Sequence, residues 1–166
     1  MQKILSQAIK EIGQYRAEIT QKLLEFARTD VLFFWGEKKD LFLRQEKEWL
    51  PILAWVEDLL KVKLKRTTDL NVPENQKMQS PLKKVFDEMS DAELACYYAA
   101  ALNMRSVLLA LAFVKGKLTA DKACELSYLE EKWQNEIWGE DEEALNRRQE
   151  RCDELKKIEA YLKAHQ

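Results

Sequence analysis

Glycine, proline and cysteine are all scarce in this chain. It has 4 glycines, 3 prolines and 3 cysteines among 166 residues. With so few helix breakers, a composition of 34% charged and 46% hydrophobic residues argues against a β-sandwich and against disorder. It predicts long amphipathic helices in a single domain, and the chain is long enough to bury a substantial core.

The side chains needed for most catalytic sites are also missing. The only histidine, His165, lies next to the C-terminus, so no serine or cysteine has a plausible histidine base. There is no glycine-rich phosphate loop, no Cys/His zinc set and no Glu-x-x-His pair of a di-iron bundle. The sequence therefore predicts a protein that is not an enzyme, with no metal, no cofactor and no small-molecule substrate.

The three cysteines, Cys96, Cys124 and Cys152, lie far apart and show neither a paired spacing nor a metal-binding pattern. We interpret them as small packing residues of a protein in a reducing compartment.

The charge pattern also limits the kind of partner. The 27 basic and 29 acidic residues are mixed along the chain, so no basic stripe is available for a nucleic acid backbone. The longest apolar run, residues 107–114, is shorter than the roughly 20 residues that span a bilayer. The N-terminus lacks the apolar core of a signal peptide. We expect a protein partner, and neither nucleic acid nor a membrane.

Apolar residues at steps of three and four predict a mainly α bundle of about five to six helices. Ser90, in a capping box, Thr119 and Asp141 mark helix starts, and Gly116 and Gly139 mark helix ends. The first expected helix ends near Ala27, and a short third one starts at Ser80. The other expected helices are Asp40–Leu60, Ser90–Lys115, Thr119–Gly139 and Asp141–Ala164. Residues 108–114 are apolar on all sides, which predicts a buried central helix.

A segment without helical periodicity separates the second and third of these helices. Val62 and Leu64 alternate with three lysines, a period of two that predicts at most one short strand or hairpin near residues 61–69. Residues 67–80 are polar and are expected to form a linker within the single domain 1–166.

Residues 106–139 carry the most specific motif of the sequence. They include Leu126-Ser127-x-Leu129-Glu130-Glu131, then the pairs Trp133-Gln134 and Trp138-Gly139. This stretch resembles the assembly chaperone family that binds the α subunit of the F-type ATP synthase head. The segments 26–32, with Phe-Ala-x-Thr-Asp-x-Leu, and 45–55, with Gln-x-x-x-Trp-x-Pro-x-x-x-Trp, are similar to two further motifs of that family.

The resemblance implies a fold and a function. The chain corresponds to the C-terminal helical domain of the family, and nothing in it matches the family's N-terminal β-rich domain. The implied function is a chaperone that holds the free α subunit and shields its β-facing surface until the β subunit displaces it. The expected location is the bacterial cytoplasm, or the mitochondrial matrix in a eukaryote. The alternative is a helical adaptor that binds a different client protein.

The same motif supplies candidate client-binding residues. On a helix, Ser127, Glu131, Gln134 and Trp138 share one face, and Glu130 lies at the edge of the apolar stripe formed by Leu126, Leu129, Trp133 and Ile137. After Gly139 the family pattern is lost, and one glutamate, Glu142 or Glu143, can be carried over. The predicted client-binding residues are Ser127, Glu130, Glu131, Gln134, Trp138 and Glu142. Geometry alone leaves open that the tryptophans belong to the core and that the glutamates cap helices or form ion pairs.

Overall fold

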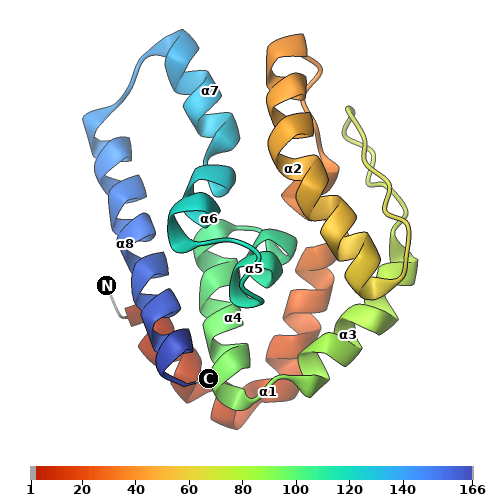
Figure 1. The fold of residues 1–166 in the computed structure, drawn as a ribbon, viewed down its shortest axis with the longest axis vertical. Coiled ribbons are helices and arrows are strands. Elements are labelled where there is room, and N and C mark those ends of the chain that lie inside the picture. The colour runs from red at the N-terminus through yellow and green to blue at the C-terminus, as the bar shows by residue number, and fades with distance from the viewer. Residues whose placement is uncertain (1–2, 166) are drawn as a thin grey trace.

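The computed structural model describes residues 3–165, with side chains from Leu5 onward, and confirms the mainly α fold (Figure 1). Short 3-10 turns at η1 (Val31–Phe33) and η2 (Gln76–Met78) accompany the helices. The α-helices of these residues are α1 (Lys3–Arg28), α2 (Lys39–Leu60), α3 (Gln79–Glu88), α4 (Asp91–Met104), α5 (Val107–Val114), α6 (Ala120–Ser127), α7 (Leu129–Trp138) and α8 (Glu142–Ala164).

The described residues thus form eight α-helices, where the sequence predicted about five to six. The difference arises because two expected helices are each divided. Between α4 and α5, Arg105 adopts a left-handed conformation with φ 56°, and the Ser106 hydroxyl accepts a hydrogen bond from Leu109 N–H at 3.1 Å to begin a new helix. Between α6 and α7, Tyr128 leaves the helical conformation with φ −109° and ψ 15°.

The short strand expected near residues 61–69 is not formed within the described residues. Thr67 makes only an isolated parallel bridge with Phe34, where Thr67 N–H donates to Phe33 O at 2.7 Å. The backbone of residues 64 and 65 forms hydrogen bonds with side chains and does not pair with another strand. Glu57 accepts from Leu64 N–H at 2.8 Å, and the Asn75 side chain bonds both the N–H and the carbonyl of Lys65.

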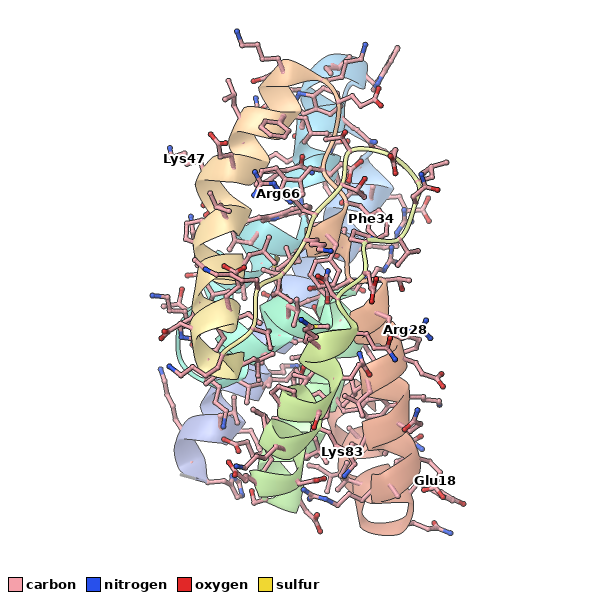
Figure 2. All side chains as sticks on the ribbon, turned by 90° about the vertical axis from the view of Figure 1, so that its right-hand side faces the viewer. Glu18, Arg28, Phe34, Lys47, Arg66 and Lys83 are labelled. Carbon is pink, nitrogen blue, oxygen red and sulfur yellow. A yellow bond between two sulfur atoms is a disulfide. The ribbon has the colours of Figure 1, made fainter. Side chains whose placement is uncertain are left out.

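This extended segment runs back beside α2, and Figure 2 shows Arg66 and Phe34 on neighbouring stretches of chain. The Arg66 guanidinium lies 4.1 Å from the centre of the Trp35 ring, a cation–π contact. The predicted polar linker, residues 67–80, continues from here through η2, and its last two residues lie in α3.

Helix α5 lies at the centre of the fold, between α4, α6 and α2 (Figure 1). All its residues from Val107 to Val114 are buried, as the apolar pattern predicted. Helix α4 is buried along most of its length and packs against α1, α5 and α8. Trp35 and Trp49 also belong to the core, so two of the five tryptophans are fully used for packing.

A buried carboxylate fixes the start of α5. Asp30, which is 3% exposed, accepts hydrogen bonds from Leu32 N–H at 3.1 Å, Ser106 Oγ at 2.8 Å and Leu108 N–H at 3.0 Å. Burial raises the pKa of Asp30, although the hydrogen bonds favour its charged form. The contacts join η1 to the α4–α5 break, and so set the position of Arg105 just before it.

Among the described helices, none combines the length and the apolar character needed to cross a membrane.

Candidate functional site

A cleft of about 440 Å³ is lined by residues of α7 and α8. The joined ends of these two helices project from the body of the fold at the upper left of Figure 1. Its floor comes from η1, the end of α4 and the α6–α7 junction, and its walls come from α7 and α8. The lining residues are Val31, Asn103, Met104, Arg105, Ser127, Tyr128, Glu130, Glu131, Gln134, Ala144, Arg147, Arg148 and Arg151.

Four of the predicted client-binding residues line this cleft: Ser127, Glu130, Glu131 and Gln134. Glu130 and Gln134 are exposed, and Glu131 and Ser127 are half-buried. Neither glutamate forms an ion pair with a residue that the structure describes. The structure therefore brings these side chains together on an accessible wall.

The other two predicted residues lie outside the cleft. Trp138, at the last turn of α7, is 83% exposed, and Ile137 beside it is 52% exposed. Glu142 is exposed in the first turn of α8. A short connection through Gly139 joins the two helix ends, so an exposed apolar helix end and an acidic helix start follow each other in the chain.

The apolar stripe expected along this segment is buried only at its beginning. Leu126 and Leu129 are in the core, whereas Trp133 is half-buried and Ile137 is exposed. Because α7 begins a new helix after Tyr128, its later turns leave the body of the fold. This exposure makes α7 a surface that is available to a partner.

Polar contacts hold the other side of α7 against α2. The indole N–H of Trp133 donates to Asp40 at 3.0 Å, and Arg44 forms an ion pair and hydrogen bond with Glu136. The Arg44 hydrogen bond lowers the pKa of the Glu136 carboxyl. Just before α7, the indole of Trp49 in α2 donates to Leu126 O, near the end of α6, at 3.2 Å. These contacts fix the position of the α7 wall.

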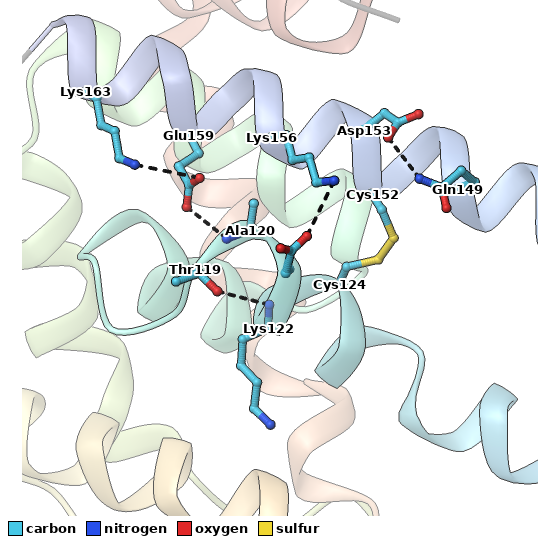
Figure 3. Close-up of polar contacts among 11 residues, drawn as sticks. Thr119, Ala120, Lys122, Cys124, Gln149, Cys152, Asp153, Lys156, Glu159 and Lys163 are labelled. Carbon is cyan, nitrogen blue, oxygen red and sulfur yellow. Dashed lines mark hydrogen bonds and ion pairs between the residues drawn. A yellow bond between two sulfur atoms is a disulfide. The ribbon is translucent and has the colours of Figure 1, made fainter.

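The α8 wall is held to α6 by a covalent bond and by polar contacts (Figure 3). Cys124 and Cys152 form a disulfide with their Cα atoms 5.4 Å apart. Glu159 accepts a hydrogen bond from Ala120 N–H at 2.9 Å, and Lys156 lies 3.6 Å from Asp121. Our interpretation of these two cysteines as unpaired packing residues is therefore wrong.

Cys96 does fit that interpretation. It is free and fully buried in α4, and burial raises the pKa of its thiol to about 12.

The basic side of the cleft was not predicted from the sequence. Arg147, Arg148 and Arg151 come from α8, and Arg105 comes from the α4–α5 break. Only the i, i+1, i+4 spacing of the three α8 arginines could have indicated a shared face, and alone it also fits a solvated helix surface. Their convergence with Glu130 and Glu131 depends on α8 returning beside α7.

The chemistry of the cleft suits recognition of charged groups. Glutamate, arginine and amide side chains offer charge-assisted hydrogen bonds. Among the described residues, the cleft lining contains no histidine, cysteine or aspartate. Within residues 3–165 no three His, Cys, Asp or Glu side chains gather in a way that could hold a metal ion.

Comparison with known proteins agrees with the motifs. Residues 1–57 match the family model described as ATP12 chaperone protein. The mitochondrial protein atp12 of Schizosaccharomyces pombe is 24% identical over 153 residues, which are 85% of this chain. The chain is related to the ATP12 chaperone proteins. The predicted family is thereby confirmed, and the family match contains the two upstream motifs, 26–32 and 45–55.

Solved structures show that the fold is shared with ATP12 proteins. Atp12 from Paracoccus denitrificans aligns with a TM-score of 0.86 and 24% identity, over 93% of this chain and 67% of that one. The Atu1473 protein of Agrobacterium tumefaciens aligns with a TM-score of 0.82 and 26% identity, over 96% of this chain and 60% of that one. The chain spans about half the length, 52%, of the S. pombe relative.

Proposed function

We propose that this chain is a chaperone for assembly of the F-type ATP synthase head, and that it binds the free α subunit. Its relation to the ATP12 chaperone proteins supports the class of function. The chain corresponds to a C-terminal helical domain, because its motifs resemble that part of the family. It acts where the head is assembled, in the bacterial cytoplasm or in the mitochondrial matrix.

The proposed mechanism is temporary cover. A free α subunit exposes the apolar surface that later contacts the β subunit, and such a surface promotes aggregation. The chaperone covers it through Ser127, Glu130, Glu131, Gln134, Trp138 and Glu142, on and beside the cleft. The β subunit forms a larger interface with α and displaces the chaperone by competition, so release requires no nucleotide hydrolysis.

The observation that carries this proposal is the outward position of the motif residues on α7. Glu130 and Glu131 line an open cleft, and Trp138 at the end of the same helix is 83% exposed. Accessible carboxylates and a free indole on one helix are a suitable contact surface, because aromatic anchors with a polar surround dominate many protein interfaces.

The test measures capture of the isolated α subunit by the purified chain. We expect the double variant Glu130→Gln and Glu131→Gln to bind the α subunit about tenfold more weakly. A solvent-exposed charge pair contributes roughly 0.2–1 kcal/mol, and two pairs at about 0.7 kcal/mol each amount to the roughly 1.4 kcal/mol of a tenfold change. The matched control is Glu18→Gln with Glu25→Gln, the same charge change at exposed positions of α1. Capture is measured by pull-down and by suppression of α-subunit aggregation.

The outcomes separate the site from the function. Weaker capture by the cleft variant, with unchanged capture by the control, supports both. Unchanged capture by the cleft variant contradicts the site assignment. If the unmodified chain neither captures the α subunit nor delays its aggregation, the chaperone function is wrong and a different client must be sought.

A further inference from the structure

We propose that the cleft between α7 and α8 binds an acidic peptide segment of the client, and that Arg147, Arg148, Arg151 and Arg105 contact its carboxylates. The inference rests on the proposed function only for the identity of the client. The four arginines and two glutamates of the lining give it a formal charge of +2, on a chain whose net charge is −2. The cleft is therefore a locally basic site on an acidic protein.

These arginines have few partners of their own. Arg105, Arg148 and Arg151 form no ion pair within the described part of the chain, and Arg147 pairs only with the exposed Glu143, at 3.2 Å. By contrast, Arg16 and Arg44 form ion pairs between helices and help to hold the fold. The guanidinium groups of the cleft remain available to a ligand.

Two of the arginines are already positioned. The Arg148 guanidinium lies over the Tyr128 ring, 5.7 Å from its centre. Arg151 donates from Nη1 to the backbone carbonyl of Asn103 at 3.4 Å. A planar guanidinium binds a carboxylate through two parallel hydrogen bonds, and holding the group in place lowers the entropy cost of binding.

The floor of the cleft contains an unused hydrogen-bond acceptor. Asn103 is 4% exposed, and its Nδ2 donates to Arg151 O at 3.1 Å. Its Oδ1 is buried and has no donor among the residues that the structure describes. A buried acceptor without a partner costs roughly 1–3 kcal/mol. Oδ1 is closed to solvent in the unbound chain, so a backbone N–H of an extended peptide in the cleft would supply the missing donor if the Asn103 amide turned toward it.

The shape of the site favours a peptide over a compact small molecule. Small-molecule pockets are mostly apolar and enclose their ligand, whereas most residues that line this cleft are charged or polar and the cleft is open to solvent. The exposed Ile137 and Trp138 continue the surface beyond the cleft. Glu130 and Glu131 on the opposite wall would accept a basic residue next to the acidic ones, and so fix the direction of the segment.

The test uses three labelled peptides of equal length, rich in glutamate, glutamine or lysine, and measures fluorescence anisotropy with the purified chain. We expect only the glutamate peptide to bind, with an affinity that falls as salt rises. The triple variant Arg147→Gln, Arg148→Gln and Arg151→Gln should lose at least about tenfold in affinity. The control variant Lys10→Gln, Lys22→Gln and Lys84→Gln, with the same charge change on α1 and α3, should bind normally.

Several results would overturn the proposal. Equal binding of the glutamine peptide, or equal losses in the cleft and control variants, would show that no specific acidic site exists. Competition by inorganic phosphate as effective as by the glutamate peptide would indicate a general anion site. The double variant Arg147→Gln and Arg148→Gln leaves the Arg151 contact with Asn103 intact, so it tests the same point if the triple variant fails to fold.

A parallel capture assay separates this inference from the proposed function. If the α subunit is captured equally well by the unmodified chain and by the arginine variants, the acidic-segment inference fails and the chaperone function stands. If the glutamate peptide binds but the α subunit is not captured, the cleft chemistry stands and the proposed client is wrong.

Discussion

Replacement of Asp30 tests whether one buried carboxylate holds η1 against the start of α5. In Asp30→Ala, the N–H groups of Leu32 and Leu108 lose their only side-chain acceptor, while the Ser106 hydroxyl can still rotate. At roughly 1.5 kcal/mol for each stranded N–H, we expect a loss of about 3 kcal/mol in the free energy of unfolding. Asp30→Asn keeps one acceptor oxygen and should lose about half of that.

Urea unfolding followed by circular dichroism measures these losses, and Ser106→Ala completes a double-mutant cycle with Asp30→Ala. A coupling of about 1–2 kcal/mol is expected because the two side chains are in direct contact. A loss below about 1 kcal/mol in Asp30→Ala, with an unchanged denaturant slope, would refute the argument that this network holds the α4–α5 break.

The same residue gives a pH dependence of defined sign. Burial raises the pKa of Asp30 above 3.8, so the folded state binds the proton more tightly than the unfolded state does. The stability that this group contributes is fully present below pH 3.8 and is lost as the pH rises through the raised pKa. Asp30→Asn should remove that part of the pH dependence, measured by thermal unfolding at a series of pH values.

Three further predictions concern other parts of the fold. Reduction of the Cys124–Cys152 bond, which spans 28 residues, should cost about 3.5 kcal/mol and lower Tm by about 10 °C, while dithiothreitol should not affect a variant with alanine at both positions. Glu154 is buried, and burial raises the pKa of its carboxyl. Urea titrations should therefore show that Glu154→Gln stabilises the fold by about 1 kcal/mol at pH 8 and by less near pH 4. Gly116 has φ +81°, so Gly116→Ala should lower the free energy of unfolding by about 1 kcal/mol. Gly13 lies in helix α1 with open space where a Cβ would be, so Gly13→Ala should raise the free energy of unfolding by up to about 1 kcal/mol.

Helix ends were predictable from the sequence where the signal is local. Ser90 accepts from Glu93 N–H at 3.1 Å and Thr119 accepts from Lys122 N–H at 3.2 Å, as their positions before apolar periodic segments indicated. Gly116 and Gly139 have positive φ values directly after their helices. Each of these ends depends on side chains within a few residues, which is why single-sequence patterns identify them.

The two helix breaks were not predicted, although Ser106 at the first of them is a local N-cap that accepts from Leu109 N–H at 3.1 Å. Arg105 takes a left-handed conformation that is rare for a residue with a side chain, and the contact that defines the break comes from Asp30, 76 residues away from Ser106. The break at Tyr128 contains neither glycine nor proline. At Arg105 and Ser106 a tertiary contact thus overrode helix propensity. The two breaks together raised the number of described helices above the expected range.

The candidate site also has one part that could be predicted from the sequence and one part that could not. The acidic wall was predictable because Glu130, Glu131 and Gln134 lie within one motif on one helix. The basic wall was not, since its arginines meet that motif only after α8 folds back, and on an isolated helix they are equivalent to solvated residues. The pairing of Cys124 with Cys152 likewise depends on this return of the chain.

The position of the disulfide also affects how the width of the cleft can change. Buried residues of α8 begin at Glu154, and the covalent link to α6 is at Cys152, so the ten residues that precede it project as a lever. That arm is about 15 Å long at 1.5 Å per residue, and a tilt of about 10° at its base would shift its tip by about 2.6 Å. Arg147 and Arg148 lie on this arm, opposite an α7 that α2 holds in place. The width of the cleft therefore depends on the tilt of the arm at its base, where the disulfide and the hydrogen bonds between Arg151 and Asn103 attach it to the fold.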